Sequence, residues 1–420
     1  MKWTTDLYLK GLGVLELVEN AQQVVEDWLH RKRGQHGGLA GKTAIVTGGN
    51  AGVGYATAEA LLARGCSVVL AVRDRGRGDA AAARLAATAA GSGGSQQLGG
   101  RQRKGGSSGG QQAGGAAAQG STAGGGPQQA EAAPEQPEAA QVAVEILDLA
   151  ILSSVRAFAE RWKASGRSLD LLVCNAGIMV PPERTITADG FELQFQSNYL
   201  GHFLLANLLV RQHQRQHAQH AQQPAQRASG AAGGSQGSGS GSSGPLRVLF
   251  LSSMTHIGGD LSDLTDVPYC RRPPWNTFAA YCNSKLCTLL AAKHMDRLLA
   301  RAAPSGDGKR DAAVAVHPGL VNTALAAGYF KQMPPKLLRP LTDPFFTHVF
   351  CPYMLRSPEA AAETVLYAAT APADEVGGRY CGTAPRVTRH SAAADDPQVA
   401  QRLWDLSAHL CQLDADDLVS

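Results

Sequence analysis

Residues 43–54, TAIVTGGNAGVG, join a short apolar run to a glycine-rich turn. A helical pattern rich in Ala and Leu follows over Tyr55–Ala63, and a second apolar run spans Ser67–Val72. Strand, glycine-rich turn, helix and strand in this order are typical of the first unit of a doubly wound parallel sheet. In such a unit, glycines let the backbone approach a pyrophosphate, and the helix N-terminus presents N–H groups to it. A glycine-rich turn alone also fits a mere tight turn, so the rest of the chain must decide.

Composition divides the 420-residue chain into one large domain and several segments outside its core. Residues 90–140 are mostly Ala, Gly, Gln and Ser, and residues 211–244 are mostly Gln, His, Ala, Gly and Ser. Neither segment shows apolar periodicity, so neither buries enough surface to offset the entropy lost on ordering. We therefore predict one α/β Rossmann domain over 39–415, with a doubly wound parallel sheet flanked by helices, interrupted by disordered inserts at 90–140 and 211–244. Residues 1–38 form a separate N-terminal segment.

The first 33 residues carry apolar side chains at spacings of three and four, and they end in His30-Arg31-Lys32-Arg33. This pattern predicts an amphipathic helix that either docks on the domain or lies in a membrane surface. No stretch reaches about 18 uncharged apolar residues, so we expect no transmembrane helix. The segment is too acidic for a typical organelle transit peptide. We expect a location on the cytoplasmic face, with peripheral attachment to an internal membrane as one alternative, and a chloroplast location stays open.

Charge and cysteine usage set limits on the partners and the compartment. A net charge of +4, spread along the chain, makes no electrostatic case for nucleic acid. The eight cysteines form no CxxC pair, and four of them fall in contexts that suit buried, reduced thiols: Cys66, Cys174, Cys282 and Cys287. We predict no metal site, because three histidines at near-helical spacing belong to a Gln- and His-rich tract: His213, His217 and His220.

Tyr281 and Lys285 stand four residues apart, a spacing that places both side chains on one face of a helix. A nearby cation favours phenolate over phenol, and so lowers the pKa of a tyrosine from about 10 towards the working pH. A phenol tuned in this way can give a proton to an oxygen or take one back. The pair also occurs by chance on solvated helices, so its meaning depends on the other motifs.

Those motifs occur in one order along the chain: Thr47 with Gly48, Gly52 and Gly54; Asp148-Leu149 after the strand Val142–Leu147; Leu171-Leu172-Val173-Cys174-Asn175-Ala176-Gly177; Asn198; Ser253 after the strand Leu246–Leu251; Tyr281 with Lys285; and His317-Pro318-Gly319-Leu320-Val321-Asn322-Thr323. Over about Leu39 to Cys411, the chain resembles the short-chain dehydrogenase/reductase superfamily. One departure is Cys174, which replaces the first Asn of the family's Asn-Asn-Ala-Gly motif. The resemblance implies a Rossmann fold that binds a nicotinamide dinucleotide.

The resemblance also implies a role for each matched residue. Tyr281 would be the general acid/base of a reversible hydride transfer, Lys285 would lower its pKa, and Ser253 would hold the substrate oxygen. Asn198 would fix a water that links Lys285 to solvent. Ser253 as a strand-end cap and Asn198 as a helix-kink ligand are the structural alternatives. The implied cofactor contacts are Thr47, Gly48, Asn50, Gly52, Val53, Gly54, Arg73, Asp148, Leu149, Asn175, Ala176, Gly177, Tyr281, Lys285, Pro318, Gly319, Val321 and Thr323.

Cofactor choice is read at the end of the second strand, where an acidic residue would bond the ribose hydroxyls of NAD. Val72 aligns with that acid and is followed by Arg73, while Asp74 comes one place too late. A guanidinium suits a 2′-phosphate through paired, charge-assisted hydrogen bonds. We therefore predict NADP(H) in preference to NAD(H). Alternatively, Arg73 forms a salt bridge with Asp74 or stacks on adenine.

Residues 320–354, which follow the Pro-Gly motif, are rich in large apolar side chains and interrupted by prolines. Such a segment predicts a lipophilic ligand or membrane contact, or else a lid that packs on its own domain or in a homodimer. Strings such as 198–205 and 321–323 resemble the retinol dehydrogenase-like branch, and 177–181 and 377–380 are closest to its X-chromosome-encoded dehydrogenase/reductase members. That branch implies retinoid- or polyprenol-like alcohols and aldehydes. The long spacing from Ser253 to Tyr281, which includes Pro273-Pro274-Trp275, is a second departure.

The leading hypothesis is an NADP(H)-dependent oxidoreductase that interconverts a lipophilic alcohol and its aldehyde or ketone. A protochlorophyllide-reductase-like enzyme is an alternative, because 172–176 resembles that group. A third hypothesis is a dinucleotide-sensing scaffold at a membrane complex, which would bind the cofactor without turning over a substrate.

Overall fold

The computed structural model describes residues 38–93, 140–222, 244–271, 275–303, 310–326, 344, 355–383 and 385–420. Three predictions therefore lie wholly or largely outside the described residues: the N-terminal amphipathic segment, most of both inserts, and most of the apolar segment 320–354.

The described residues form one parallel sheet of seven strands in the order β3-β2-β1-β4-β5-β6-β7. The chain begins in the middle at β1, runs outward to β3, and then crosses back to β4 on the other side of β1. This reversal defines a doubly wound sheet. The fold prediction is confirmed. The strands are β1 Thr43–Thr47, β2 Ser67–Val72, β3 Val142–Ile146, β4 Leu171–Cys174, β5 Arg247–Leu251, β6 Ala312–Val316 and β7 Tyr380–Cys381.

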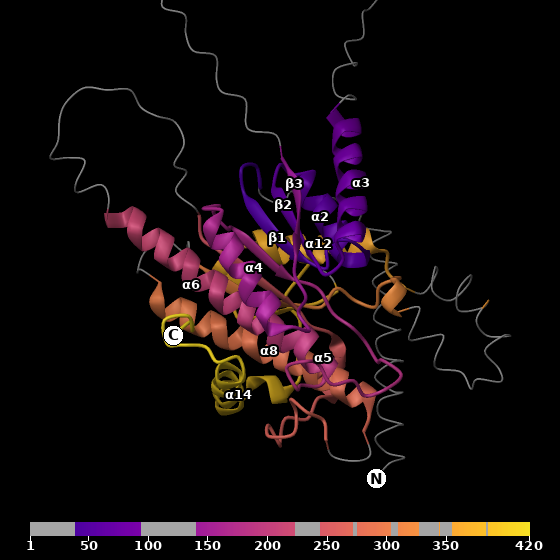
Figure 1. The fold of residues 1–420 in the computed structure, drawn as a ribbon, viewed down its shortest axis with the longest axis vertical. Coiled ribbons are helices and arrows are strands. Elements are labelled where there is room, and N and C mark those ends of the chain that lie inside the picture. The colour runs from indigo at the N-terminus through magenta and orange to yellow at the C-terminus, as the bar shows by residue number, and fades with distance from the viewer. Residues whose placement is uncertain are drawn as a thin grey trace, which may run out of the picture.

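Helices cover both faces of the sheet, and each face has its own apolar core (Figure 1). Successive side chains of a strand point to opposite faces, so Ile45 joins one core while Ala44 and Val46 join the other. This explains why β1 is apolar throughout. One face carries α4 Leu152–Ala164, α6 Gly201–Gln222 and α8 Thr277–Ala302; the other carries α2 Gly52–Leu62, α3 Arg75–Gly93 and α12 Pro358–Thr370.

Several short helices and turns connect the main strands and helices. A three-residue helix and a π-helical turn lead into α6, and a 3-10 turn follows β5. The remaining elements lie in the C-terminal part. They are α5 Leu193–Phe195, η1 Gln196–Leu200, η2 Met254–Gly258, α13 Ala373–Val376, η4 Ala392–Asp395 and α14 Pro397–Leu410.

The predicted insert at 211–244 begins too early, because α6 continues to Gln222. The helix continues because segments distant in the sequence provide partners for its side chains. Nε of Arg211 donates to the Asp416 carbonyl at 2.9 Å, and Arg215 pairs with Asp417 at 3.2 Å. His213 is buried, with Nε2 3.4 Å from a carboxylate oxygen of Asp311. Composition cannot reveal such partners, so these residues were misassigned to a disordered tract.

The predicted first insert also begins too early, since α3 runs to Gly93. At the other end, the domain extends past residue 415. Val419 is buried, and its N–H donates to Oδ1 of Asn207 on α6 at 2.9 Å. The last residues are therefore part of the packed domain.

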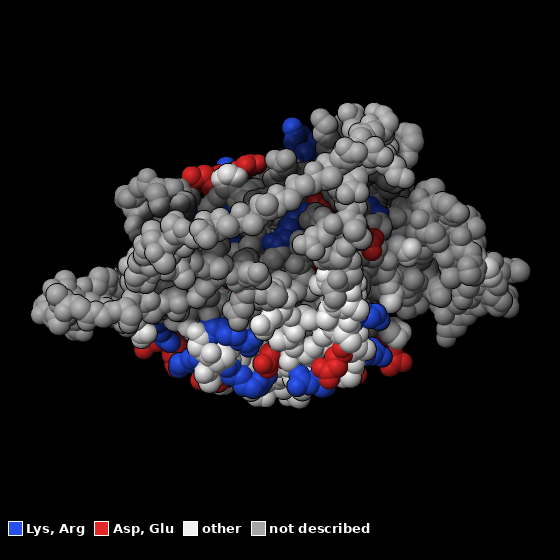
Figure 2. Space-filling view, turned by 90° about the horizontal axis from the view of Figure 1, so that it is seen from above, with Lys and Arg blue, Asp and Glu red and all other residues white. Residues whose placement is uncertain are grey.

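Surface and membrane features are reported for the described residues alone. On the face shown in Figure 2, basic and acidic side chains are interspersed along the described surface. Among the helices placed in the structure, none is long and apolar enough to cross a membrane. Cys66, Cys174, Cys282 and Cys287 are buried free thiols, as predicted.

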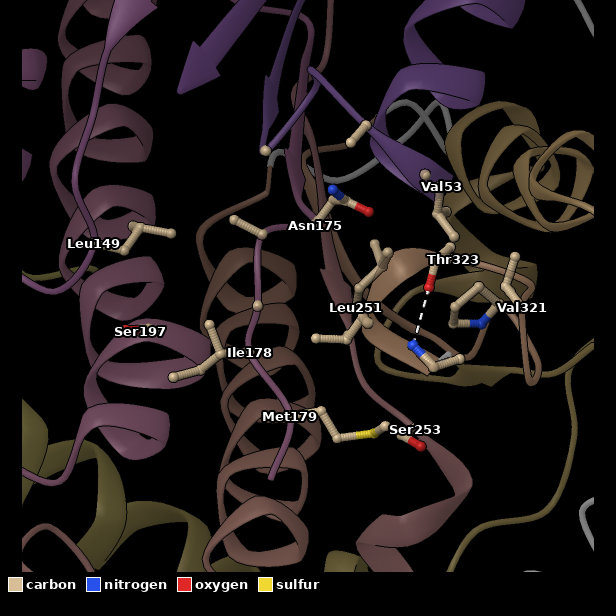
Figure 3. A pocket seen from close by; sticks show the side chains of 18 of the residues that line it. Val53, Leu149, Asn175, Ile178, Met179, Ser197, Leu251, Ser253, Val321 and Thr323 are labelled. Carbon is tan, nitrogen blue, oxygen red and sulfur yellow. Dashed lines mark hydrogen bonds between the residues drawn. The ribbon is translucent and has the colours of Figure 1, made fainter. Parts of the chain in front are cut away.

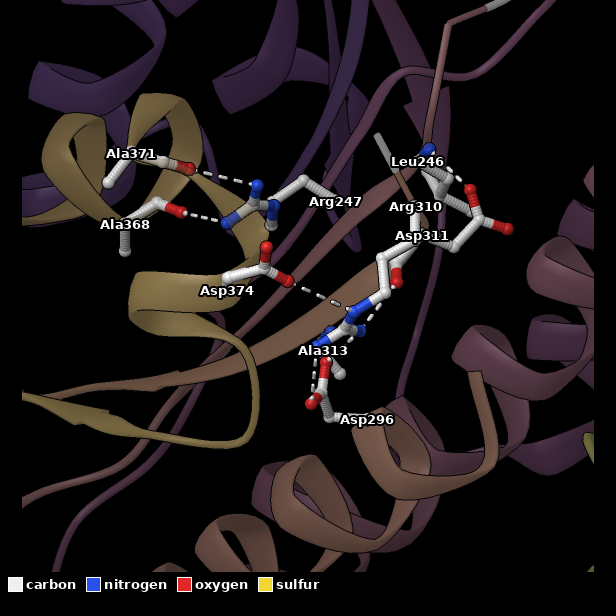
Figure 4. A network of polar contacts seen from close by, with 9 residues as sticks. All are labelled: Leu246, Arg247, Asp296, Arg310, Asp311, Ala313, Ala368, Ala371 and Asp374. Carbon is white, nitrogen blue, oxygen red and sulfur yellow. Dashed lines mark hydrogen bonds and ion pairs between the residues drawn. The ribbon is translucent and has the colours of Figure 1, made fainter. Parts of the chain in front are cut away.

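A buried ion pair fastens β6 to α8 at the edge where the strands begin (Figure 4). Arg310 donates two hydrogen bonds to Asp296, at 2.8 and 3.1 Å, and Asp296 also accepts the N–H of Ala313. Beside it, Arg247 of β5 donates to the carbonyls of Ala368 and Ala371 at the end of α12. These contacts hold α8 and α12 against the sheet. They lie at the edge where the strands begin, away from the edge where the strands end.

We predict that Asp296→Ala lowers the free energy of unfolding by about 3 kcal/mol, because Asp296 is buried and its loss leaves the half-buried Arg310 guanidinium without its main partner. Asp374→Ala is the matched control, since Asp374 is exposed and lies 4.0 Å from the same guanidinium. Its loss should cost less than about 1 kcal/mol. Denaturant unfolding measures both, and equal effects would contradict the prediction.

Candidate active site

A cavity of about 960 Å³ lies where β1, β2, β4, β5 and β6 end. Parallel strands present all their carboxyl ends at one edge, and the divergence of the chain at β1 and β4 opens a crevice there. Most predicted site residues line it (Figure 3). They are Gly48, Asn50, Gly52, Val53, Arg73, Asp148, Leu149, Asn175, Ala176, Gly177, Ser253, Tyr281, Lys285, Pro318, Gly319, Val321 and Thr323.

The glycine-rich turn has the geometry that its sequence predicts. Gly48 and Gly52 have φ of 65° and 55°, values that side chains rarely adopt. A Cβ on Gly54 would lie 2.5 Å from the Gly48 carbonyl oxygen, so only glycine fits. The N-cap residue of α2 is Ala51, whose methyl group cannot accept a hydrogen bond from the first-turn N–H groups. This turn therefore suits an anion such as a pyrophosphate.

Thr47 and Gly54 were predicted as cofactor contacts, but they lie behind the cavity wall. Oγ1 of Thr47 accepts the N–H groups of Asn175 and Ala176, both at 2.9 Å. Nδ2 of Asn175 donates to the Thr47 carbonyl at 2.8 Å. Thr47 thus joins the end of β1 to the end of β4, and it positions residues that do line the cavity.

His202 extends this link, and sequence reasoning assigned it no role. Its Nδ1 lies 3.0 Å from the Asn198 carbonyl, which can only accept, so Nδ1 carries the proton. Nε2 then accepts from the Thr47 hydroxyl at 2.9 Å. Burial lowers the pKa of His202 to about 4, so the ring stays neutral. The order Asn198-x-x-x-His202 on one helical face was the signal that could have revealed it.

Asn198 lies in a π-helical turn, behind the wall rather than on it. Its Oδ1 accepts the N–H of Ile178 at 2.8 Å, and its Nδ2 donates to the Ile178 carbonyl and to Oγ of Ser284 at 3.0 Å. These contacts brace the Asn175–Ile178 segment against α8. The partners of the Asn198 carboxamide are thus Ile178 and Ser284, and its water-binding role stays a prediction.

Helix α8 brings Tyr281 and Lys285 to the cavity together, as their spacing predicts. Both are 6% exposed, and Nζ of Lys285 lies 5.7 Å from the centre of the Tyr281 ring. Nζ donates to the Leu251 carbonyl at 2.8 Å. Burial lowers the pKa of Lys285 to about 8, because an ammonium group is poorly solvated there.

The side chains of the two adjacent serines after β5 point in different directions. Ser252 donates to the Lys285 carbonyl at 2.8 Å and so faces the helix backbone. Ser253 faces the cavity, and its Oγ accepts the Thr255 N–H at 3.3 Å, so it also caps the turn that follows. Ser253 is therefore the serine available to a bound molecule.

Arg77 is a cavity residue that was not predicted from the sequence. It lies at the end of the cavity beside the carboxyl end of β2, which we call the adenosine end. Arg77, near the start of α3, lines the same cavity as Arg73. The Asp74 carboxylate accepts the N–H of Arg77 at 2.9 Å, so it faces Arg77. The spacing of four residues between the two arginines was the available signal.

The end of the cavity beyond Tyr281 has apolar walls. Met179 and Ser253 both line it (Figure 3). Phe278 and Asn276 line the same cavity and come directly after the unusual Pro273-Pro274-Trp275 stretch, two residues of which lie outside the described part of the chain. Met179, Phe278 and Asn276 were not predicted, because no motif identifies them.

Comparisons with known proteins agree with this geometry. The chain is 30% identical to Homo sapiens retinol dehydrogenase 13 over 418 residues, which cover 97% of this chain and 96% of that protein. It is 32% identical to Danio rerio polyprenol dehydrogenase, over 89% of this chain and 87% of that protein. An uncharacterised protein from Mycobacterium paratuberculosis has a solved structure with a TM-score of 0.55 and 28% identity, over 90% of this chain and 96% of that one.

No protein-family model matches the chain. The curated relatives are nevertheless matched over almost their full length, and the sheet order, the glycine-rich turn and the Tyr281/Lys285 pair are those that the resemblance implied. The chain belongs to the short-chain dehydrogenase/reductase superfamily of oxidoreductases, in its retinol dehydrogenase-like branch.

Proposed function

We propose that this protein is an NADP(H)-dependent oxidoreductase that interconverts a lipophilic alcohol and its aldehyde or ketone. One observation carries the proposal: Tyr281, Lys285 and Ser253 line the same cavity as the glycine-rich turn. A nucleotide held by that turn at one end of the cavity leaves the other end for a substrate beside the phenol.

Proton transfer is the part of the reaction that the chain's own residues perform. When bound, the nicotinamide supplies or accepts the hydride at the reacting carbon. Tyr281 gives its proton to the carbonyl oxygen during reduction, and takes it back from the alcohol during oxidation. Ser253 donates a hydrogen bond that holds this oxygen near the phenol. The ammonium of Lys285 favours the phenolate form of Tyr281.

Lys285 is held for this role by the Leu251 carbonyl, and indirectly by Asn198 through Ser284 on the same helix. The water-binding role implied for Asn198 remains a proposal. Its side chain supports instead a bracing function, because the carboxamide already bonds Ile178 and Ser284.

Two guanidinium groups support the choice of NADP(H). Arg73 and Arg77 both line the adenosine end and are exposed, so both can reach a 2′-phosphate. Position 72, where NAD-binding relatives of the fold carry an acid, is a buried valine. The alternative in which Arg73 pairs with Asp74 is less well supported, because Asp74 bonds Arg77.

A lipophilic substrate is supported by Met179, Leu193, Met254 and Phe278, which form apolar wall at the substrate end. The relatives named above are a retinol dehydrogenase and a polyprenol dehydrogenase. We propose a retinoid- or polyprenol-like alcohol or its aldehyde as the substrate. Peripheral membrane contact through 1–33 and 320–354 and a homodimer are parts of the same proposal.

We predict that Tyr281→Phe lowers the rate of NADPH oxidation by about 10²–10⁴-fold, since it removes the proton donor. The assay uses aldehydes from short-chain to retinal and polyprenal, with Tyr269→Phe as control because Tyr269 lies outside the cavity.

Equal rates for short and long aldehydes would contradict the proposal of a lipophilic substrate. Cofactor binding without turnover of any aldehyde would favour the dinucleotide-sensing scaffold, and light-dependent turnover of a bound pigment would favour the protochlorophyllide-reductase-like enzyme.

Replacing both Arg73 and Arg77 with Ser should raise KM for NADPH about 10–100-fold and leave KM for NADH little changed. Each hydrogen bond from these exposed side chains is worth about 1 kcal/mol, and about 1.4 kcal/mol corresponds to a tenfold change in binding. Arg75→Ser is the matched control, because Arg75 donates to the Val144 carbonyl at 2.7 Å instead of lining the cavity. Parallel losses with both cofactors would show that the arginines do not select NADPH.

We expect kcat/KM for NADPH to fall as pH rises through about 8, because Lys285 then loses the proton that supports the Tyr281 phenolate. Below that pH the ammonium is retained, so the rate loss lies on the alkaline side. Lys285→Arg should move the loss to higher pH, since a guanidinium stays protonated there. A pH profile that is the same in both proteins would rule out Lys285 as the group.

A further inference from the structure

His256 lies between the turn that carries Ser253 and the carboxyl-terminal part of the chain. It belongs to η2, three residues after Ser253, and it is 1% exposed. Its Nδ1 is 2.7 Å from the Ser253 carbonyl oxygen. Its Nε2 is 3.1 Å from the backbone nitrogen of Ser391, which immediately precedes η4. The imidazole thus connects two segments that are 138 residues apart in the sequence (391 − 253).

These two contacts determine the tautomer. A backbone carbonyl only accepts, so the proton is on Nδ1, and a backbone N–H only donates, so Nε2 is the acceptor. A proton on Nε2 would point at the N–H of Ser391. Burial lowers the pKa of His256 to about 4 against the opposing Ser253 hydrogen bond, and the nearby His390 and Lys293 act in the same direction as burial. The ring is therefore neutral over the usual assay range.

The Ser253 carbonyl receives two donors from the same residue. Besides Nδ1, the backbone N–H of His256 donates to it at 3.1 Å. The His256 ring also packs edge to face with Tyr380, with ring centroids 5.0 Å apart. The Ser253 hydroxyl faces the cavity from the residue whose carbonyl the imidazole binds.

The segment around Ser391 is itself held firmly. His390 Nε2 is 2.8 Å from both Nζ of Lys293 and Oδ1 of Asp395, so α8 anchors this segment independently. His256 therefore bonds a fixed point at Ser391, and through it the carboxyl-terminal part of the chain supports the turn that carries Ser253.

We propose that His256 is a positioning residue: its neutral, Nδ1-protonated ring ties the Ser391 backbone to the Ser253 carbonyl and so aims the Ser253 hydroxyl at the substrate oxygen. The inference rests on the proposed function for the role of Ser253. Under this proposal, the turn that carries Ser253 is held in place by a residue that does not line the cavity, His256.

Two variants separate the two ring contacts. The amide nitrogen of Asn occupies the place of Nδ1, and the amide oxygen of Gln reaches the place of Nε2. His256→Asn keeps the donor to Ser253 and loses the acceptor for Ser391, and His256→Gln does the reverse. We expect kcat for aldehyde reduction to fall about tenfold in each variant, the size of one lost hydrogen bond, because each variant breaks one end of the tie between Ser391 and Ser253. KM for NADPH should be unchanged in both.

The Ser253→Ala background tests whether the effect passes through the hydroxyl. There, neither the Asn nor the Gln substitution should lower kcat further, because the group to be aimed is absent. A further loss in that background would overturn the proposal, as would full kcat in either variant of the otherwise unchanged chain. Tyr281→Phe, measured in parallel, reports on the proposed function separately: if it retained full activity, the proposed reaction would fail whatever the His256 variants showed.

Folding of the variants is not needed for a second measurement. In protein labelled with ¹⁵N-histidine, nitrogen chemical shifts distinguish the two neutral tautomers of His256. The Nδ1-protonated form, unchanged from pH 8 to pH 6, supports the proposal. A proton on Nε2, or a doubly protonated ring in this range, would overturn it.

Discussion

The hydroxyl of Thr47 is the point where the two halves of the sheet meet. It accepts two backbone N–H groups from the end of β4 while it donates to a buried neutral histidine on α6. β1 and β4 diverge here, so their ends cannot continue as a regular hydrogen-bonded ladder, and their buried N–H groups need other acceptors. One side chain satisfies them. The glycine-rich turn and the Asn175–Gly177 segment thereby form adjoining parts of the cavity wall.

From this junction a chain of contacts reaches the reactive end of the cavity. His202 bonds the carbonyl of Asn198, and the carboxamide of Asn198 bonds Ile178 and Ser284. Ser284 is adjacent to Lys285 on α8. Each of these polar side chains thus has a hydrogen-bond partner that is itself buried, and this network makes the cavity wall rigid. None of the three side chains lines the cavity itself. A rigid wall matters because proton transfer requires the phenol, the serine hydroxyl and the substrate oxygen within hydrogen-bond distance.

Much of this could be predicted from the chain alone. The strand–turn–helix–strand order at 43–72, the doubly wound sheet and the joint location of Tyr281, Lys285 and Ser253 were all expected, because each depends on local periodicity or on motif order. One error concerns the boundary of an insert. Residues 211–222 were assigned to it, although Arg211 and Arg215 find partners at Asp416 and Asp417, which lie far away in the sequence. The cofactor contact of Thr47 stays a prediction, and its hydroxyl accepts the N–H groups of Asn175 and Ala176.

The fold family and the shared location of Tyr281 and Lys285 follow from the chain alone, since a glycine that no other residue can replace and two side chains one helical turn apart are local requirements. Only the tertiary structure decided that Ser252 bonds the Lys285 carbonyl, that Arg77 joins Arg73, and that His256 and His202 are held as defined neutral tautomers. The physical reason is that orientation and protonation depend on which donors and acceptors surround a group, and these come from β5, α6, α8 and the carboxyl-terminal segment. Only the packed chain brings those elements together.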